Sequence, residues 1–274
     1  MNILCTKAEL GEGVFWDASQ EVLYWLDINN YKLFSLKKEM TCSYSLNEKA
    51  STILDVRGGS IYMASESGIF SFTPKLNETL QVSKIPKKYL SKKYRANDGI
   101  KISKNNFVYG VMNNNPAKGD GAIIISKNGL DSIVYEGISI PNTFIRLPNT
   151  NSILISDSFE KKIFKFNFNS SWDYILDYSL WLDLNASNRI PDGGCISTLG
   201  RIFISIWDGF EVLELDIDGN IVDALPLPVP RPTDCVLNTI ENCLFVSTAF
   251  EGLSKKTQQE FPLSGSLLKI KVKI

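Results

Sequence analysis

Four polar side chains occupy comparable places in the sequence and could do chemistry together. Each precedes the first apolar segment of a repeating unit by about 10 to 12 residues: Glu12, Asn97, Asn142 and Asp192. Two carboxylates and two amides converging from different parts of the chain would offer hard oxygen ligands to a divalent cation. The spacing therefore predicts a cation site.

Each of these positions taken alone also fits a simpler interpretation. Glu12 stands between two glycines, a pattern typical of an exposed turn. Asn97 begins Asn-Asp-Gly and Asp192 precedes two glycines, and both are strong turn signals. Only the shared spacing favours the cation site, and we expect the polar residues to lie on turns between structural units.

Composition removes several classes of chemistry. The chain of 274 residues has no histidine, which excludes Ser-His-Asp and Cys-His hydrolases and zinc sites with histidine ligands. Its 29 basic and 30 acidic residues leave a net charge of −1, so we expect neither a nucleic-acid partner nor a membrane partner. Catalysis has to use carboxylates, lysine, tyrosine or cysteine side chains, or a metal held by oxygen ligands.

A repeat dominates the sequence. Short apolar segments, each followed by a polar turn and a second strand pattern, recur about every 38 to 49 residues: Leu23–Trp25, Ile61–Met63, Phe107–Tyr109, Ile153–Ile155, Ile202–Ile204 and Leu244–Val246. Six such units predict an all-β fold, a six-bladed β-propeller, as a single domain over residues 1–274, with little helix. A pair of β-sandwiches is the alternative. We expect the segment from Ile3 to Thr6 to pair with the last blade and close the ring.

The cysteines and the N-terminal segment indicate the compartment. Five cysteines without a C-x-x-C pair predict reduced thiols rather than a disulfide framework, and Cys195 is interpreted as a structural thiol rather than a nucleophile. No basic segment followed by a long apolar one begins the chain. We therefore expect a cytoplasmic protein.

At these residues the sequence resembles the senescence-marker-protein/gluconolactonase/regucalcin family of six-bladed propellers. The resemblance runs nearly from end to end. It is carried by an ordered set of motifs: Leu10–Trp16, Leu23–Ile28, Arg95–Gly99, Asn142 with Asp157–Ser158, Pro191–Gly193, Pro228–Cys235 and Pro262–Leu267.

The resemblance implies a function and a set of roles. Glu12, Asn142 and Asp192 would be metal ligands, Arg95 and Asn97 would contact substrate, and Asp192 would also be the general base. The implied activity is hydrolysis of a small-molecule sugar lactone with one divalent ion, Ca²⁺, Zn²⁺, Mg²⁺ or Mn²⁺. The ion would polarise the lactone carbonyl.

Two positions depart from the family pattern. Thr143 follows Asn142, where the family usually has glycine, and a β-branched residue tolerates a positive φ poorly, so we expect a different loop there. The family often carries a carboxylate just after the strand that ends at Met112. This chain has Asn113–Asn115 there instead, which removes a charge near the substrate.

Two other function classes remain open at this point. One is a non-catalytic divalent-cation (calcium) binding protein of the same fold, which differs from the lactonase in lacking metal-dependent turnover. The other is a protein-interaction propeller, favoured only by the single run Tyr24–Asp27.

Overall fold

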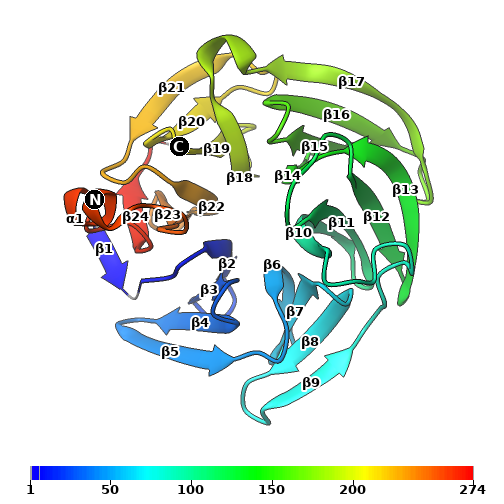
Figure 1. Cartoon of the computed structure of the whole chain (residues 1–274), viewed down its shortest axis with the longest axis horizontal. Coiled ribbons are helices and arrows are strands. Elements are labelled where there is room, and N and C mark those ends of the chain that lie inside the picture. Colours follow the sequence, from blue (N-terminus) through cyan, green and yellow to red (C-terminus); the bar gives the residue numbers. More distant parts are fainter. Residues whose placement is uncertain (1, 6, 274) are drawn as a thin grey trace. The chain divides into compact units, whose positions relative to one another are not determined.

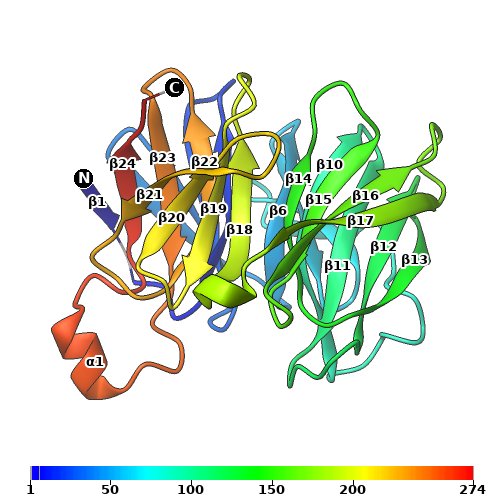
Figure 2. The same ribbon diagram turned by 90° about the horizontal axis from the view of Figure 1, so that it is seen from above.

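The computed structural model describes residues 2–5 and 7–273, with side chains from residue 7 onward. Over these residues the chain forms 24 strands in six antiparallel sheets of four strands each (Figure 1). One α-helix, α1 (Lys255–Glu260), lies beyond the strand ends of the sheets nearest to it in sequence (Figure 2). The predicted fold class, a six-bladed β-propeller with little helix, is confirmed.

The strands divide into two compact units of three sheets each. The unit Leu46–Ala186 contains β6 (Ala50–Arg57), β7 (Ser60–Ser65), β8 (Ile69–Thr73) and β9 (Glu78–Gln81); β10 (Tyr94–Ser103), β11 (Asn106–Asn113), β12 (Gly121–Lys127) and β13 (Leu130–Ile138); and β14 (Pro141–Arg146), β15 (Ser152–Asp157), β16 (Lys162–Phe168) and β17 (Ile175–Asp183). A 3₁₀ turn, Asn185–Ser187, follows β17. The expectation of a single domain over residues 1–274 stays a prediction.

The other unit joins Met1–Ser45 to Ser187–Ile274. It contains β2 (Gly11–Asp17), β3 (Val22–Asp27), β4 (Lys32–Lys37) and β5 (Met40–Ser45); β18 (Ile190–Ile196), β19 (Ile202–Trp207), β20 (Glu211–Leu215) and β21 (Ile221–Pro226); and β22 (Pro232–Asn238), β23 (Cys243–Thr248), β24 (Leu267–Lys271) and β1 (Asn2–Cys5). The expected pairing of the N-terminal strand with the last sheet is confirmed, because β1 pairs with β24. Thr6 lies outside the described residues.

The apolar segments that revealed the repeat are the second strands of the sheets. Most of their residues are buried, and β11 shows how one such strand packs against the sheets on both sides of it within the unit of residues 46–186. In β11, Phe107 and Tyr109 pack in a core with Leu54 of the preceding sheet, whereas Val108 packs in a core with Ile153 of the following sheet. Successive side chains of one strand point to opposite faces of its sheet, so a single strand contributes to two hydrophobic cores.

Most residues are exposed in four of the outermost strands, β5, β9, β17 and β21. All four residues of β9 are exposed, and most of β5 is exposed as well. The described residues contain no helix long and apolar enough to cross a membrane.

Two aspartates at the ends of second strands fix the chain where it enters first strands. Asp27 accepts hydrogen bonds from the backbone N–H groups of Glu9 (2.9 Å) and Leu10 (3.4 Å), and from the side-chain amide of Asn30 (2.9 Å). Asp157 does the same in its own sheet, accepting from the N–H of Ser139 at 2.8 Å. The aspartates therefore set where β2 and β14 begin.

Replacing Asp27 with alanine should lower the free energy of unfolding by about 3 kcal/mol, because several buried donors lose a charged acceptor at once. Urea denaturation followed by tryptophan fluorescence measures the loss. Asp177→Ala is the control, since Asp177 is exposed and accepts a hydrogen bond from the side-chain amide of Asn167; it should cost less than about 1 kcal/mol. Equal losses for both variants would contradict the assigned role.

Candidate functional site

The predicted site residues lie on strands, at irregularities of the first strands of their sheets. The turn interpretation was therefore wrong: Glu12 is in β2, Asn97 in β10, Asn142 in β14 and Asp192 in β18. The strand register shifts at these points: between Glu12 and Phe15, Ala96 and Gly99, Asn142 and Ile145, and Pro191 and Gly194. An irregularity of this kind bends a strand and re-aims a side chain, which explains how turn-forming residues fit inside strands.

In the unit of residues 46–186, two of the predicted side chains are hydrogen-bonded in series to the backbone that precedes Asn142. The Nη1 atom of Arg95 donates to Oδ1 of Asn97 at 2.6 Å, and to the carbonyl of Ala96 at 2.9 Å. Nδ2 of Asn97 donates to the carbonyl of Pro141 at 3.0 Å. Pro141 directly precedes Asn142, so Arg95 orients Asn97, and Asn97 in turn holds the strand that carries Asn142.

Asp98 ties the first strands of this unit together. Its Oδ2 accepts from the N–H of Phe144 at 3.0 Å, and its Oδ1 from the N–H of Gly99 at 2.7 Å and the hydroxyl of Thr52 at 3.2 Å. Burial raises the pKa of Asp98, and these hydrogen bonds oppose the rise by stabilising the charged form. One carboxylate thus links β6, β10 and β14.

Asp234 does the same in the other unit. Its Oδ2 accepts from the N–H of Val14 at 2.9 Å, and its Oδ1 from the N–H of Cys235 at 2.7 Å. On its other side stands Gly193, where a Cβ atom would lie 2.4 Å from Oδ1 of Asp234. Asp234 therefore lies between the strand that carries Glu12 and the strand that carries Asp192.

The two carboxylates predicted as ligands differ in their burial. Asp192 is 6% exposed, and Glu12 is half-buried with its Oε2 accepting from the N–H of Gly13 at 3.4 Å. Asn142 is buried, and its Oδ1 accepts from the N–H of Thr143 at 3.2 Å. Glu12 and Asn142 thus make the same local contact with the following amide.

The predicted residues are divided between the two compact units of the chain. Arg95, Asn97 and Asn142 belong to the unit of residues 46–186, and Glu12 and Asp192 to the other. Within the described residues no three or more acidic or cysteine side chains cluster as a metal site. The predicted ligand set needs no such cluster, because its two carboxylates and one amide supply the hard oxygen donors that a divalent ion prefers.

Sequence reasoning missed Asp98 and Asp234 as members of the site region. Their positions in the repeat could have identified them. Asp98 directly follows Asn97 and Asp234 directly follows Thr233, and both pairs lie at the irregularity of a first strand. Asn-Asp-Gly was interpreted as a local turn, whereas the Asp98 carboxylate is used by a strand 46 residues away.

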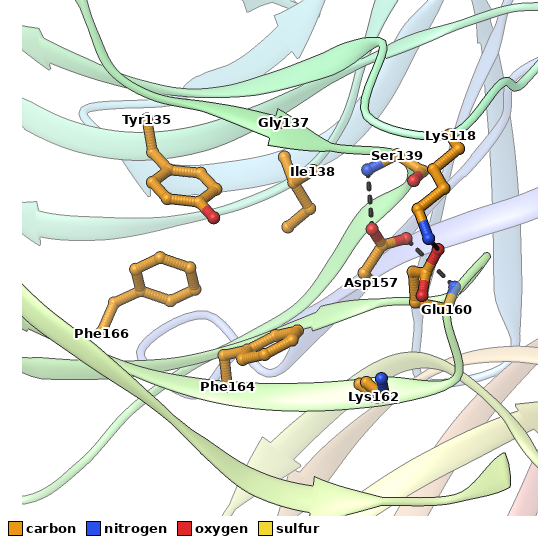
Figure 3. A pocket seen from close by; sticks show the side chains of 10 residues that line it. All are labelled: Lys118, Tyr135, Gly137, Ile138, Ser139, Asp157, Glu160, Lys162, Phe164 and Phe166. Carbon is orange, nitrogen blue, oxygen red and sulfur yellow. Dashed lines mark hydrogen bonds and ion pairs between the residues drawn. The ribbon is translucent and has the colours of Figure 1, made fainter.

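A pocket of about 210 Å³ lies elsewhere in the unit of residues 46–186 (Figure 3). Tyr135, Phe164 and Phe166 line one side, and Lys118 pairs with Glu160 at 2.9 Å on the other. None of the predicted site residues lines this pocket.

Comparison with known proteins decides the family. Residues 10–250 match the SMP-30/Gluconolactonase/LRE-like region. The chain belongs to this family. It is 21% identical to pentonolactonase XacC of Haloferax volcanii (90% of this chain, 84% of that protein), and 22% identical to 6-deoxy-6-sulfogluconolactonase of Pseudomonas putida (97% and 92%). Its fold matches that of a calcium-binding protein, regucalcin, from Agrobacterium tumefaciens with a TM-score of 0.92 at 20% identity, covering 98% and 92% of the two chains.

Thr143 departs from the SMP-30/gluconolactonase pattern in residue type and keeps the backbone conformation that glycine would adopt. Its φ is +56°, close to the +57° of the equivalent Gly13 in β2, so Thr143 adopts a positive φ that a β-branched residue disfavours. The side chain is fully buried, and its Oγ1 accepts from the hydroxyl of Ser156 at 3.0 Å. This contact helps to offset a backbone cost of about 1–3 kcal/mol.

The second departure from the SMP-30/gluconolactonase pattern forms a polar network of its own. Nδ2 of Asn113 donates to Asp120 at 2.6 Å, and Asp120 also accepts from Tyr94 (2.8 Å) and pairs with Lys93 (3.0 Å). These partners lower the pKa of Asp120. A carboxylate therefore remains beside Tyr94, which directly precedes Arg95, although the run Asn113–Asn115 holds none.

Thr143→Val should lower the free energy of unfolding by about 1–3 kcal/mol, because the buried Ser156 hydroxyl loses its acceptor while the positive φ remains. Thr143→Ser keeps the hydroxyl and should cost less than about 1 kcal/mol. Denaturation midpoints of the two variants measure the difference. Losses of the same size would show that the hydroxyl contact contributes nothing.

Proposed function

We propose that this protein is a divalent-metal-dependent sugar lactonase. The observation that carries the proposal is the shared position of Glu12, Asn97, Asn142 and Asp192 at the irregularities of four first strands, where strand geometry re-aims a side chain. Family membership and the lactonase names of two relatives that cover nearly the whole chain support the substrate class.

Glu12, Asn142 and Asp192 are the proposed ligands of the metal ion. The set contains oxygen donors alone, which suits Ca²⁺, Mg²⁺ and Mn²⁺ better than Zn²⁺, because zinc favours nitrogen and sulfur ligands. A bound divalent ion would supply Lewis-acid polarisation of the lactone carbonyl and a lower pKa for water.

Asp192 is the proposed general base. It accepts the proton of the attacking water as the carbon–oxygen bond forms, and its burial limits competing contact with bulk solvent. The strand that carries Asp192 packs against Asp234 through Gly193, which has no Cβ to obstruct the approach. That contact limits movement of the base.

Arg95 and Asn97 are the proposed substrate-binding residues. The guanidinium of Arg95 is a donor-only group that suits carbonyl, hydroxyl and ring oxygens of a sugar lactone. Because Arg95 already fixes the amide of Asn97, the two side chains present a preorganised pair, and orientation of this kind lowers the entropic cost of reaction.

Metal-stripped protein should not hydrolyse aldonolactones, and adding back a divalent ion should restore turnover. Asp192→Asn should lower kcat/KM by at least about 100-fold, because the general base is lost. Asp223→Asn is the matched control, since Asp223 is exposed on β21 of the same sheet, and it should leave kcat/KM unchanged. A pH-stat assay over a lactone panel gives both results, and unaltered turnover in Asp192→Asn would remove Asp192 from the mechanism.

Arg95→Lys should lower kcat/KM by about 10–100-fold, because lysine keeps the charge and loses the planar fork that fixes Asn97. Calorimetric titration should find the affinity for the metal unchanged, since Arg95 is not a proposed ligand. Arg146→Lys is the control, because Arg146 donates to the carbonyl of Ile102 and stands outside the Arg95–Asn97 contact. A matching loss of metal affinity in Arg95→Lys would indicate general damage to the site.

A non-catalytic cation-binding protein is the second candidate. It is favoured by the fold match to a protein described as calcium-binding. Both candidates predict metal binding by Glu12, Asn142 and Asp192, so turnover separates them. Metal binding without hydrolysis of any lactone would favour the second candidate.

A further inference from the structure

Two free thiols face each other across neighbouring first strands. Sγ of Cys195 in β18 lies 4.0 Å from Sγ of Cys235 in β22, and neither cysteine is in a disulfide. The strands already approach closely here, since Gly193 leaves no room for a Cβ beside Asp234. A disulfide needs an S–S distance of about 2.05 Å, so the sulfurs have to move together by roughly 2 Å.

The two thiols differ in accessibility. Cys195 is half-buried, whereas Cys235 is buried in the core that includes Phe203 and Val246. The hydrogen bond with Cys195, together with burial, raises the pKa of the Cys235 thiol well above its ordinary value. Cys195 is consequently the sulfur that a reagent from solvent meets first.

The other thiols with described side chains lack this arrangement. Cys42 is exposed on β5, the outermost strand of its sheet. Cys243 is buried in the core around Trp25 and Phe245, apart from the core of Cys235. The pair of Cys195 and Cys235 is therefore the favoured position for a bond between thiols within one chain.

We propose that Cys195 and Cys235 form an oxidative modification site, at which a peroxide converts the two thiols into an intramolecular disulfide. The Cys195 sulfur attacks a peroxide oxygen, the O–O bond breaks, and the departing oxygen leaves as water with the thiol proton, which gives a sulfenic acid. The Cys235 sulfur then attacks the Cys195 sulfur, the S–O bond breaks, and the hydroxyl leaves as water with the second thiol proton. The two electrons lost by the thiols reduce the peroxide.

The modification would act on strands that carry the candidate site. Cys195 comes three residues after Asp192 on β18, and Cys235 directly follows Asp234 on β22. A bond between the sulfurs would join covalently the two strands that now meet through Gly193 and Asp234.

The test exposes the reduced, folded protein to hydrogen peroxide. One portion is analysed directly by intact mass and by thiol titration in denaturant, and a second portion is alkylated for peptide mapping. We expect two of the chain's five thiols to be lost and the mass to fall by two hydrogen atoms. A single cross-linked peptide should contain Cys195 and Cys235, and dithiothreitol should restore both thiols. No substrate is required, so the result is independent of the proposed lactonase activity.

Matched variants make the result decisive. Cys195→Ser, at a half-buried position that accepts a hydroxyl, should abolish the cross-link, and Cys235→Ser should do the same. Cys243→Ser removes a thiol outside the pair and should leave the cross-link intact. Oxidation of Cys195 to a sulfinic acid without a cross-link, a disulfide mapped to other cysteines, or an unchanged cross-link in Cys195→Ser would each overturn the proposal.

Discussion

The site region depends on carboxylates that accept backbone N–H groups from neighbouring first strands. A strand irregularity leaves an amide without a partner in its own sheet, and a buried amide without a partner is costly. Asp98 satisfies the N–H of Phe144 in this way, and Asp234 satisfies that of Val14. The irregularities can then present Asn142 and Glu12, because each amide two residues further on is bonded to a carboxyl oxygen.

The same arrangement occurs in both compact units. Thr52 contacts Asp98 as Gly193 contacts Asp234, and in each case the carboxylate also binds the amide of the residue that follows it. Asp98 and Asp234 thus make the same backbone contacts in their two sheets, although the residue beside them on the preceding sheet differs. A hydroxyl suffices at Thr52, whereas Gly193 has to be glycine because the strands approach more closely there.

The sequence predicted those parts of the fold that are determined locally. The second strands were recognisable because burial on both faces requires continuous apolar segments such as Phe107–Tyr109. The fourth strands, among them β9, were not, since exposed residues carry no burial pattern. The four polar residues with shared spacing lie at irregularities of four first strands. They were expected on turns, because the partner of Asp98 is a tertiary contact that no local pattern reveals.

Two further features show the same limit. Thr143 adopts a positive φ that its residue type disfavours, because a buried contact with Ser156 and the surrounding strands hold it there. Cys195 was interpreted as a structural thiol rather than a nucleophile. Its neighbour Cys235 lies 40 residues further along the chain, which the fold alone brings within 4.0 Å.

The last sheet, made from β22, β23, β24 and the N-terminal β1, has a consequence for biosynthesis. The unit Leu46–Ala186 is one continuous segment, so the strands of its three sheets have all been synthesised before β18 begins. In the other unit, β1 gains its partner only once β24 has been synthesised, and until then β1 is an unpaired strand. A chain truncated before β24 would leave β1 without that partner, and an unpaired strand is open to association with other chains.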